Sequence, residues 1–211
     1  MIALAVAATE SGRPLLSALI TGVAGLGRET NILAGAAQPI PRCRRDWLRL
    51  VIAFVLVVLP LIVWLDYLRS IYRSTIRSGT NQLVPPGTAL ADTWRDLLFR
   101  DLPIHGLFSM KGLWLCLLGS LAAQAIYLVV RRQYAAPWWR VAAAYAVLML
   151  LMERSLVDPD TAAVTRVLLP LTVGFNVLLA AEPRGTRFWP WFAAGNAHLI
   201  AAPTAMPLTP W

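Results

Sequence analysis

The stretch from Leu48 to Leu65, LRLVIAFVLVVLPLIVWL, decides the fold class of this chain. A helix needs about 20 mostly apolar residues to cross the hydrocarbon core of a bilayer, and this run comes close to that length. Two more runs do so, Gly112 to Val130 and Ala162 to Ala181. We therefore predict an all-α, polytopic transmembrane helix bundle that forms a single membrane domain over residues 1–211.

The composition of the whole chain agrees with a lipid environment. Hydrophobic residues make up 58% of the 211 residues and charged residues 14%, and the mean hydropathy is +0.61. Soluble domains keep about a quarter of their residues charged. The formal net charge of +8 comes from arginines at the ends of apolar runs rather than from one basic and aromatic tract, which argues against a nucleic-acid partner.

Three less apolar segments complete the expected bundle. Residues 138–154 predict a fourth span, and residues 188–202 predict a weak last span, interrupted by Gly195, Asn196 and His198. Residues 1–40 predict short or re-entrant helices, because Arg28 and Glu29 lie near the middle of the apolar stretch from Leu15 to Ala37. A single span across this stretch is the alternative.

Arginine-bearing joints between the apolar runs predict the orientation, since short joints rich in arginine face the cytoplasm. These joints contain Arg42, Arg44, Arg45, Arg131, Arg132, Arg140, Arg184 and Arg187. The segment 66–110 then lies outside, with two short amphipathic extracytoplasmic helices separated at Pro85 and Pro86. We expect a multi-pass protein of the bacterial inner, or cytoplasmic, membrane, with tryptophans near the span edges as anchors.

The charged pair at Arg28 and Glu29 is a candidate polar site. A charge near the bilayer centre costs about 2.5 to 3.5 kcal/mol on insertion scales, so it is rarely placed there without a use. One interpretation is an ion pair at a helix break that shapes a polar cavity, with Arg28 available to a lipid phosphate. The other is that the two charges neutralise each other between packed helices or reach the headgroups.

Three arginines recur every four residues in the outer segment: Arg69, Arg73 and Arg77. On a helix they would present guanidinium groups along one face, which suits a phosphate or diphosphate headgroup. The alternative is an interfacial helix whose arginines meet bulk lipid phosphates and water. Asp66 precedes this row and is a candidate arginine partner.

Arg166 and Asn176 lie in the run from Ala162 to Ala181. Arg166 either extends to the membrane surface or faces a cavity and holds a lipid-linked phosphate. We expect Asn176 to form an interhelical hydrogen bond. His105 and His198 are far apart and lack neighbouring carboxylates, so we predict no metal site, and no cofactor motif is present.

Three stretches resemble bacterial multi-pass GT-C glycosyltransferases and their relatives, which use polyprenyl-phosphate-linked sugars. They are Gly12 to Thr30, Trp64 to Tyr72, and Arg166 to Leu171 with Phe175 and Asn176. The resemblance implies hexosyl transfer from a polyprenyl-phosphate-linked donor. The candidate lipid-phosphate ligands are then Arg28, Arg69, Arg73, Arg77 and Arg166. Such enzymes carry their catalytic acid in a first outer loop near the start of a longer chain, and nothing in this sequence matches that loop.

We therefore expect the chain to correspond to the later part of such an enzyme, to lack a catalytic base, and to be inactive without its N-terminal half or a partner membrane subunit. A second hypothesis is a non-enzymatic subunit or scaffold that binds anionic lipid through the same arginines. A third is a carrier, because helices broken near mid-membrane also build transport sites.

Overall fold

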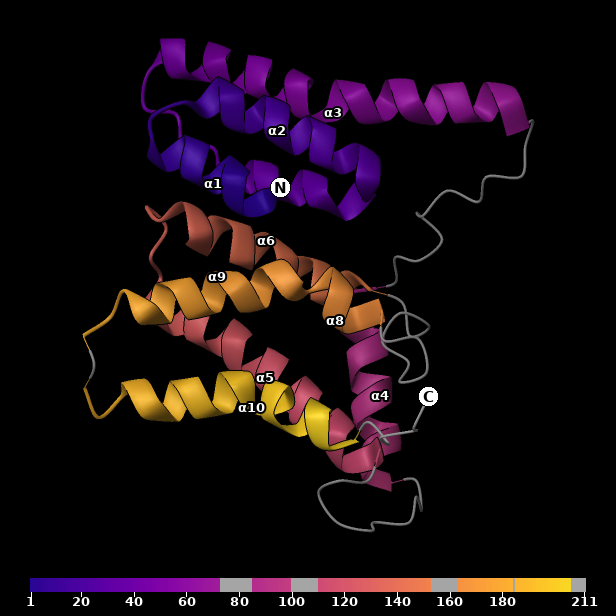
Figure 1. The fold of residues 1–211 in the computed structure, drawn as a ribbon, viewed down its shortest axis with the longest axis vertical. Helices are drawn as coiled ribbons and strands as arrows, with labels where there is room; N and C mark the ends of the chain where they lie inside the picture. The colour runs from indigo at the N-terminus through magenta and orange to yellow at the C-terminus, as the bar shows by residue number, and fades with distance from the viewer. Residues whose placement is uncertain (73–84, 100–109, 153–162, 184, 206–211) are drawn as a thin grey trace. The chain divides into compact units, whose positions relative to one another are not determined.

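The computed structural model describes residues 1–72, 85–99, 110–152, 163–183 and 185–205, and within them every regular element is helical (Figure 1). The elements are α1 (Ile2–Glu10), α2 (Pro14–Gly27), η1 (Glu29–Ala37), α3 (Arg44–Tyr72), α4 (Thr88–Phe99), α5 (Met110–Arg131), α6 (Pro137–Leu151), α8 (Ala163–Val167), α9 (Leu169–Ala180) and α10 (Phe188–Ala205). The all-α expectation is confirmed for this part of the chain.

The chain divides into two compact units, whereas the sequence predicted one domain. Unit 1 comprises Met1–Asn81 with Gln133–Tyr145, and unit 2 comprises Gln82–Arg132 with Ala146–Trp211. Helix α6 therefore contributes its first residues to unit 1 and its last residues to unit 2.

In unit 1, helix α2 packs closely against α1 and α3 through small residues. A turn at Gly12, with φ of 73°, reverses the chain between α1 and α2. At Gly22, an added Cβ would lie 2.3 Å from the Leu56 carbonyl oxygen of α3. Only glycine permits this approach. Buried Ala18 packs with Ala53 and Val57 in the same contact. Small residues at helix crossings are typical of helices that pack within a membrane.

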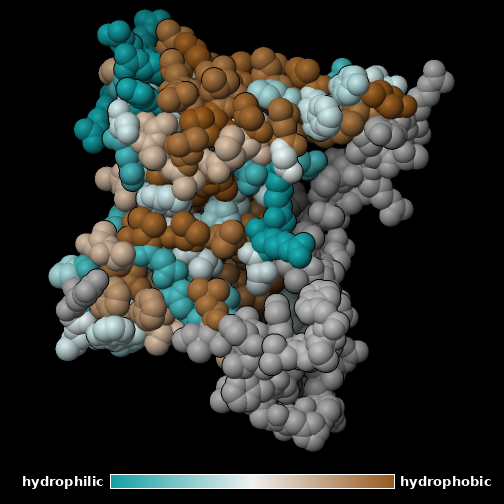
Figure 2. All heavy atoms as spheres, in the orientation of Figure 1, coloured by the Kyte–Doolittle hydropathy of each residue, from teal (hydrophilic) through white to brown (hydrophobic). Residues whose placement is uncertain are grey.

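The large apolar side chains of unit 1 face outward. Helix α3 is one of two helices long and apolar enough to cross a membrane, and only 11% of its most apolar 18-residue window is buried. A core helix of a soluble protein would bury that window. In Figure 2 the surface along α3 is mostly brown, the colour of hydrophobic residues, and teal residues gather where α3 begins. The surface of α3 therefore suits lipid.

The first forty residues form two short helices and the 3-10 helix η1, broken at Arg28. A 3-10 helix of nine residues is unusual, because its hydrogen bonds are poorly aligned. Side chains of η1 and of its C-cap residue hold it against α2. Asn31 donates to the Ala24 carbonyl at 3.0 Å and Gln38 to the Pro14 carbonyl at 3.0 Å. These contacts fix η1 against α2.

In unit 2, α5 packs against α9 and α10 around a buried aromatic cluster. Tyr127 is fully buried and meets Phe175 and Trp191 edge to face, with ring centroids 5.1 Å and 5.4 Å apart. Helix α5 is the second candidate span, Trp114–Arg131, with 44% of its apolar window buried. At Gly195 an added Cβ would lie 2.4 Å from the Phe175 ring, so this glycine allows α10 to reach α9.

Two helical regions of unit 2 can be compared with the predicted spans. The described part of the predicted span 162–181 is divided into α8 and α9, which meet at Leu168. Pro170 explains the break, since it lacks an N–H and its ring clashes with the carbonyl four residues earlier. The predicted weak span 188–202 corresponds to α10, which is continuous through Gly195, Asn196 and His198.

The outer segment also differs from the expectation. Helix α3 continues without a break through Asp66 to Tyr72, so no separate amphipathic helix begins at its end within the described residues. The second expected helix corresponds to α4, which begins directly after Gly87, a residue with φ of 79°.

We expect Gly22→Ala to lower the free energy of unfolding by about 1 to 3 kcal/mol. The added Cβ meets the backbone oxygen of Leu56, which cannot rotate away as a side chain would. Gly27→Ala is the matched control, because a Cβ there meets nothing within 4 Å. Denaturant unfolding of the purified protein in detergent measures both variants. Equal stabilities would contradict the close approach of α2 and α3.

Candidate functional site

The predicted charged pair lies at the break between α2 and η1. Arg28 has extended backbone, with φ −159° and ψ 122°, so the side chains of Arg28 and Glu29 point to opposite sides. No ion pair joins them, and the expectation of a neutral pair is wrong. Arg28 is half-buried near Tyr145, whose hydroxyl donates to the Thr30 carbonyl at 2.8 Å, and Glu29 is exposed.

Among the described residues, no other predicted lipid-phosphate ligand lines the cavity described next. Asp66 and Arg69 are exposed near the C-terminal end of α3, and Arg166 is exposed on α8 in unit 2. Arg73 and Arg77 lie outside the described residues. Asn176 forms the interhelical hydrogen bond that the sequence predicted, with Asn196 on α10.

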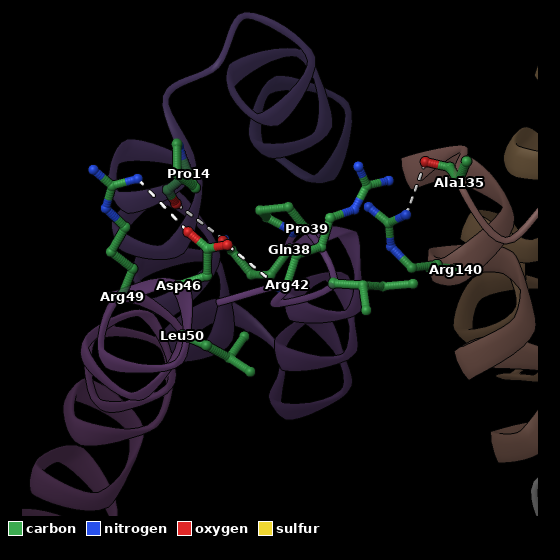
Figure 3. A pocket seen from close by; sticks show the side chains of 10 residues that line it. Pro14, Gln38, Pro39, Arg42, Asp46, Arg49, Leu50, Ala135 and Arg140 are labelled. Atoms are coloured by element: carbon green, nitrogen blue, oxygen red, sulfur yellow. Dashed lines mark hydrogen bonds and ion pairs between the residues drawn. The ribbon is translucent and has the colours of Figure 1, made fainter. Parts of the chain in front are cut away.

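The structure instead assembles arginines from two of the joints around a cavity of about 340 Å³ in unit 1 (Figure 3). Arg42 and Arg49 reach it from the start of α3, and Arg140 reaches it from α6, with Asp46 as the acidic residue. Three arginines and one aspartate give this basic pocket a net charge of +2. The remaining lining residues are Pro14, Gln38, Pro39, Ile40, Leu50 and Ala135.

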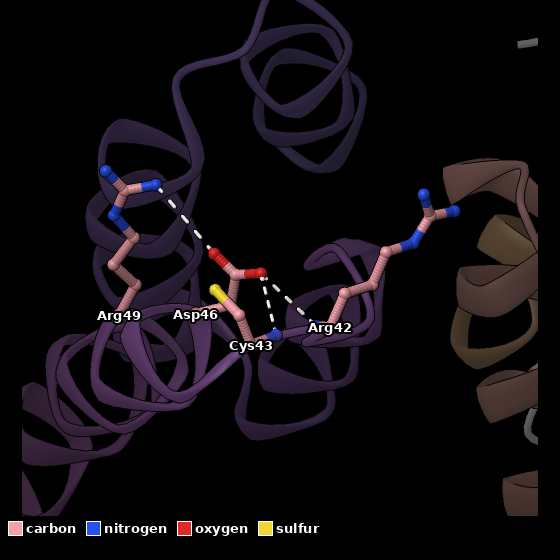
Figure 4. A network of polar contacts seen from close by, with 4 residues as sticks. All are labelled: Arg42, Cys43, Asp46 and Arg49. Atoms are coloured by element: carbon pink, nitrogen blue, oxygen red, sulfur yellow. Dashed lines mark hydrogen bonds and ion pairs between the residues drawn. The ribbon is translucent and has the colours of Figure 1, made fainter.

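Asp46 orders the turn that carries two of these arginines (Figure 4). Its Oδ2 accepts the backbone N–H groups of Arg42 at 3.2 Å and Cys43 at 3.3 Å, as an acidic residue in the first turn of a helix commonly does. Its Oδ1 lies 4.0 Å from Nη1 of Arg49. Asp46 precedes the apolar run of α3, and hydrogen bonds from the Cys43 side chain and the Arg42 backbone lower the pKa of its carboxyl. The carboxylate is therefore ionised at neutral pH.

Arg140 is occupied by backbone carbonyl oxygens. Its Nε donates to Ala36 at 3.1 Å and its Nη2 to Ala37 at 2.7 Å, both at the end of η1. Its Nη1 donates to Tyr134 at 2.8 Å and Ala135 at 2.9 Å, in the turn before α6. Four of the five donors of the guanidinium are therefore used in positioning the chain. Arg140 joins η1 to α6 and forms one wall of the basic pocket.

Arg42 differs, because its guanidinium has no partner among the described residues. In Figures 3 and 4 its side chain extends away from Asp46, toward the wall formed by α6. A cation that shares a cavity with other cations is stabilised by a bound anion, and the planar fork of arginine matches a phosphate or carboxylate. The basic pocket can therefore hold an anionic group.

A second arginine-bearing cavity, in unit 2, contains an acidic partner for one of its two arginines. It has a volume of about 380 Å³ and is lined by Arg131, Glu182 and Arg187 among others. Nη2 of Arg131 lies 2.6 Å from Oε2 of Glu182, and the Tyr127 hydroxyl donates to Oε1 at 2.9 Å. The Glu182 carboxylate thus already serves as the anion for Arg131.

Amide side chains link the helices of unit 2. Asn176 and Asn196 exchange two hydrogen bonds, at 2.9 Å and 3.0 Å. Buried Gln124 donates to the Gly195 carbonyl at 2.7 Å and accepts from the Thr172 hydroxyl at 3.2 Å. These bonds run between α5, α9 and α10, so we assign Asn176 and its neighbours a structural role.

Sequence reasoning missed the basic pocket because it read Arg42 and Arg140 only as markers of orientation. One local signal was present: an aspartate three residues after Cys43 at the start of a helical run marks a capped helix start. Arg140 offered no signal, since its partners at Ala36 and Ala37 are backbone groups 104 and 103 residues away. Among the described residues no cluster of three or more His, Cys, Asp or Glu side chains could hold a metal.

We expect Arg140→Lys to lower the free energy of unfolding by roughly 2 to 4 kcal/mol, since lysine keeps the charge but cannot reach four carbonyls with one ammonium group. Arg45→Lys, at an exposed position outside the basic pocket, is the matched control and should change little. Thermal unfolding in detergent measures the difference. A loss seen equally in both variants would point to arginine content rather than to this geometry.

For unit 2 we expect strong coupling between Asn176 and Asn196. Asn176→Leu or Asn196→Leu should each cost about 1 to 3 kcal/mol of unfolding free energy, because each removes both hydrogen bonds between the amides and leaves the remaining amide with only a carbonyl of its own helix. The double variant should cost less than the sum, since both polar groups are removed together. Denaturant unfolding of the four proteins gives the coupling energy, and strict additivity would rule out the paired amides.

No protein-family model, curated protein or solved structure matches this chain. Two features of the chain itself bear on its function. Helix α3 is apolar and exposed along most of its length, and the basic pocket lies at the polar start of that helix.

Proposed function

We propose that this chain is a multi-pass protein of the bacterial inner membrane that serves as a non-catalytic subunit or scaffold and engages anionic lipid through its arginine-bearing joints. The observation that carries the proposal is α3. A helix this long and apolar, with 11% of its apolar window buried and starting at Arg44 rather than at the N-terminus, matches neither a soluble core helix nor a signal sequence.

The arginine joint before α3 supports the lipid-binding part of the proposal. Arg42, Arg44 and Arg45 are exposed directly before the apolar run, and Trp47 is exposed beside them. Arginine and tryptophan at the edge of a span anchor a helix at the level of lipid headgroups. Juxtamembrane arginines also attract anionic lipid by about 1 kcal/mol each.

A second candidate is sugar transfer from a polyprenyl-phosphate-linked donor, the activity implied by the resemblance. The observation in its favour is Arg28, which lies at a helix break in one of the resembling stretches and has no side-chain partner among the described residues. A transfer assay with the chain and its partner subunit tests it: Arg28→Ala should abolish transfer, and Arg13→Ala should not. Transfer unaffected by Arg28→Ala would exclude the assignment.

We expect the chain to stay in the membrane pellet at alkaline carbonate pH and to leave it only with detergent, because its apolar helices have no aqueous alternative. Quantitative blotting of pellet and supernatant measures this. Release by carbonate alone would contradict an integral membrane protein.

The two native cysteines test the orientation. Cys43 is exposed in the arginine joint and Cys116 lies partly buried within α5. A membrane-impermeant maleimide should label Cys43 in inverted vesicles and not in right-side-out vesicles. In the Cys43→Ser control, Cys116 should stay unlabelled until detergent is added. Labelling of Cys43 from the outer side would reverse the proposed orientation.

A further inference from the structure

We propose that unit 1 holds one anionic phospholipid, with its phosphate beside Arg42 in the basic pocket and one acyl chain in an apolar groove along α3. The inference rests on the proposed membrane location and deepens it, since it replaces a general attraction to anionic lipid with one built site. The inference is based on two adjoining cavities, one lined by arginines and the other by apolar side chains.

The apolar groove has a volume of about 510 Å³ and lies within unit 1, between η1, α3 and the first part of α6. Ile32, Leu33, Val51, Phe54, Val58 and Ala144 represent its walls. Apart from Gln38 and the indole of Trp47, every side chain that lines it is apolar. Such a surface suits a hydrocarbon chain and offers almost nothing to a polar ligand.

The groove and the basic pocket adjoin. Gln38 and Leu50 line both cavities, so the apolar groove along α3 borders the cavity that contains the arginines. Gln38 is held in place by its hydrogen bond to the Pro14 carbonyl at 3.0 Å. Trp47 is 59% exposed at the end of the groove where α3 begins, the level at which tryptophan marks the headgroup boundary. The two cavities thus follow the layout of a lipid, chain next to headgroup.

The charges favour a phosphate over a neutral headgroup. Asp46 is committed to two backbone N–H groups and to Arg49, and Arg140 has one donor left after its four carbonyls. Within the part of the chain that the structure describes, no group accepts a hydrogen bond from the guanidinium of Arg42. A phosphodiester accepts several hydrogen bonds at once and brings negative charge to a pocket with a net charge of +2. In a zwitterionic headgroup this negative charge is offset by a positive group of the same headgroup.

Binding of two tail-labelled lipids with the same chains tests the proposal. Purified full-length protein in detergent is titrated with fluorescent phosphatidylglycerol and, separately, with fluorescent phosphatidylcholine. We expect tighter binding of phosphatidylglycerol, and an affinity about tenfold lower in Arg42→Gln/Arg49→Gln, as loss of charge-assisted hydrogen bonds predicts. Arg13→Gln/Arg95→Gln removes the same charge at two exposed arginines that lie neither in the basic pocket nor in the arginine joints, and should leave the affinity within about twofold.

A second pair of variants tests the groove. Val51 and Ile52 are neighbouring exposed residues of α3, 55% and 43% exposed, and only Val51 lines the groove. Both positions accept a larger side chain without disturbing a core. Val51→Trp should fill the groove and weaken phosphatidylglycerol binding about tenfold, whereas Ile52→Trp should bind as the parent does.

Three results would overturn the lipid site: equal binding of the two lipids, equal effects of the two arginine pairs, or equal effects of the two tryptophan variants. Displacement of the lipid by millimolar inorganic phosphate would reduce the site to one for a free anion and would also overturn it. The membranes from which the protein is purified are first extracted with carbonate. Protein that stays in the membrane but binds without selectivity rejects this inference alone, and protein released by carbonate rejects the proposed function as well.

Discussion

Where Gly22 of α2 meets the carbonyl oxygen of Leu56 on α3, the two helix backbones approach as closely as glycine allows. The rest of unit 1 depends on that contact. Because the residues between α2 and α3 are small, the large side chains of both helices are left on the outside. In water this arrangement would expose far more apolar surface than a folded unit tolerates, whereas in lipid it costs nothing. The outward position of the large apolar side chains in unit 1 therefore supports the proposed membrane location.

The same constraint explains how polar groups are used. Away from water every buried N–H and C=O needs a partner, and the nine-residue 3-10 helix η1 has poor internal hydrogen bonds. Arg140, Asn31 and Tyr145 supply hydrogen bonds to and around it. In unit 2, Gln124 and the pair Asn176 and Asn196 do the same between α5, α9 and α10. The guanidinium of Arg42 has no partner among the described residues and shares a cavity with two other arginines, and this combination is the basis of the proposed ligand.

Local features of the sequence predicted the elements well. Length and hydropathy alone identified the run at Leu48, and the predicted start of a second outer helix after Pro85 and Pro86 agrees with α4, which begins at Thr88. The break at Leu168 could also have been predicted, since Pro170 lies inside the predicted span. Hydropathy averaged over the run does not detect it. Contacts between residues far apart in the sequence could not be predicted. The partners of Arg140 and Gly22 are backbone atoms far along the chain, and no side-chain pattern marks a backbone partner. The predicted site at Arg28 was located at a true break, but extended backbone at that residue separates the two charges that the sequence had paired.

The claim that α3 lies in lipid is tested most directly by its exposure to two collision reagents. Nitroxide labels are placed singly at outward positions Val51, Val55, Leu59 and Ile62 and at inward positions Ala53 and Val57 of the protein in bilayer nanodiscs. The outward labels should collide frequently with oxygen, which concentrates in hydrocarbon, and rarely with a water-soluble nickel chelate, while the inward labels should be protected from both. Outward labels that collide readily with the nickel chelate would show that α3 lies in water and would contradict the account.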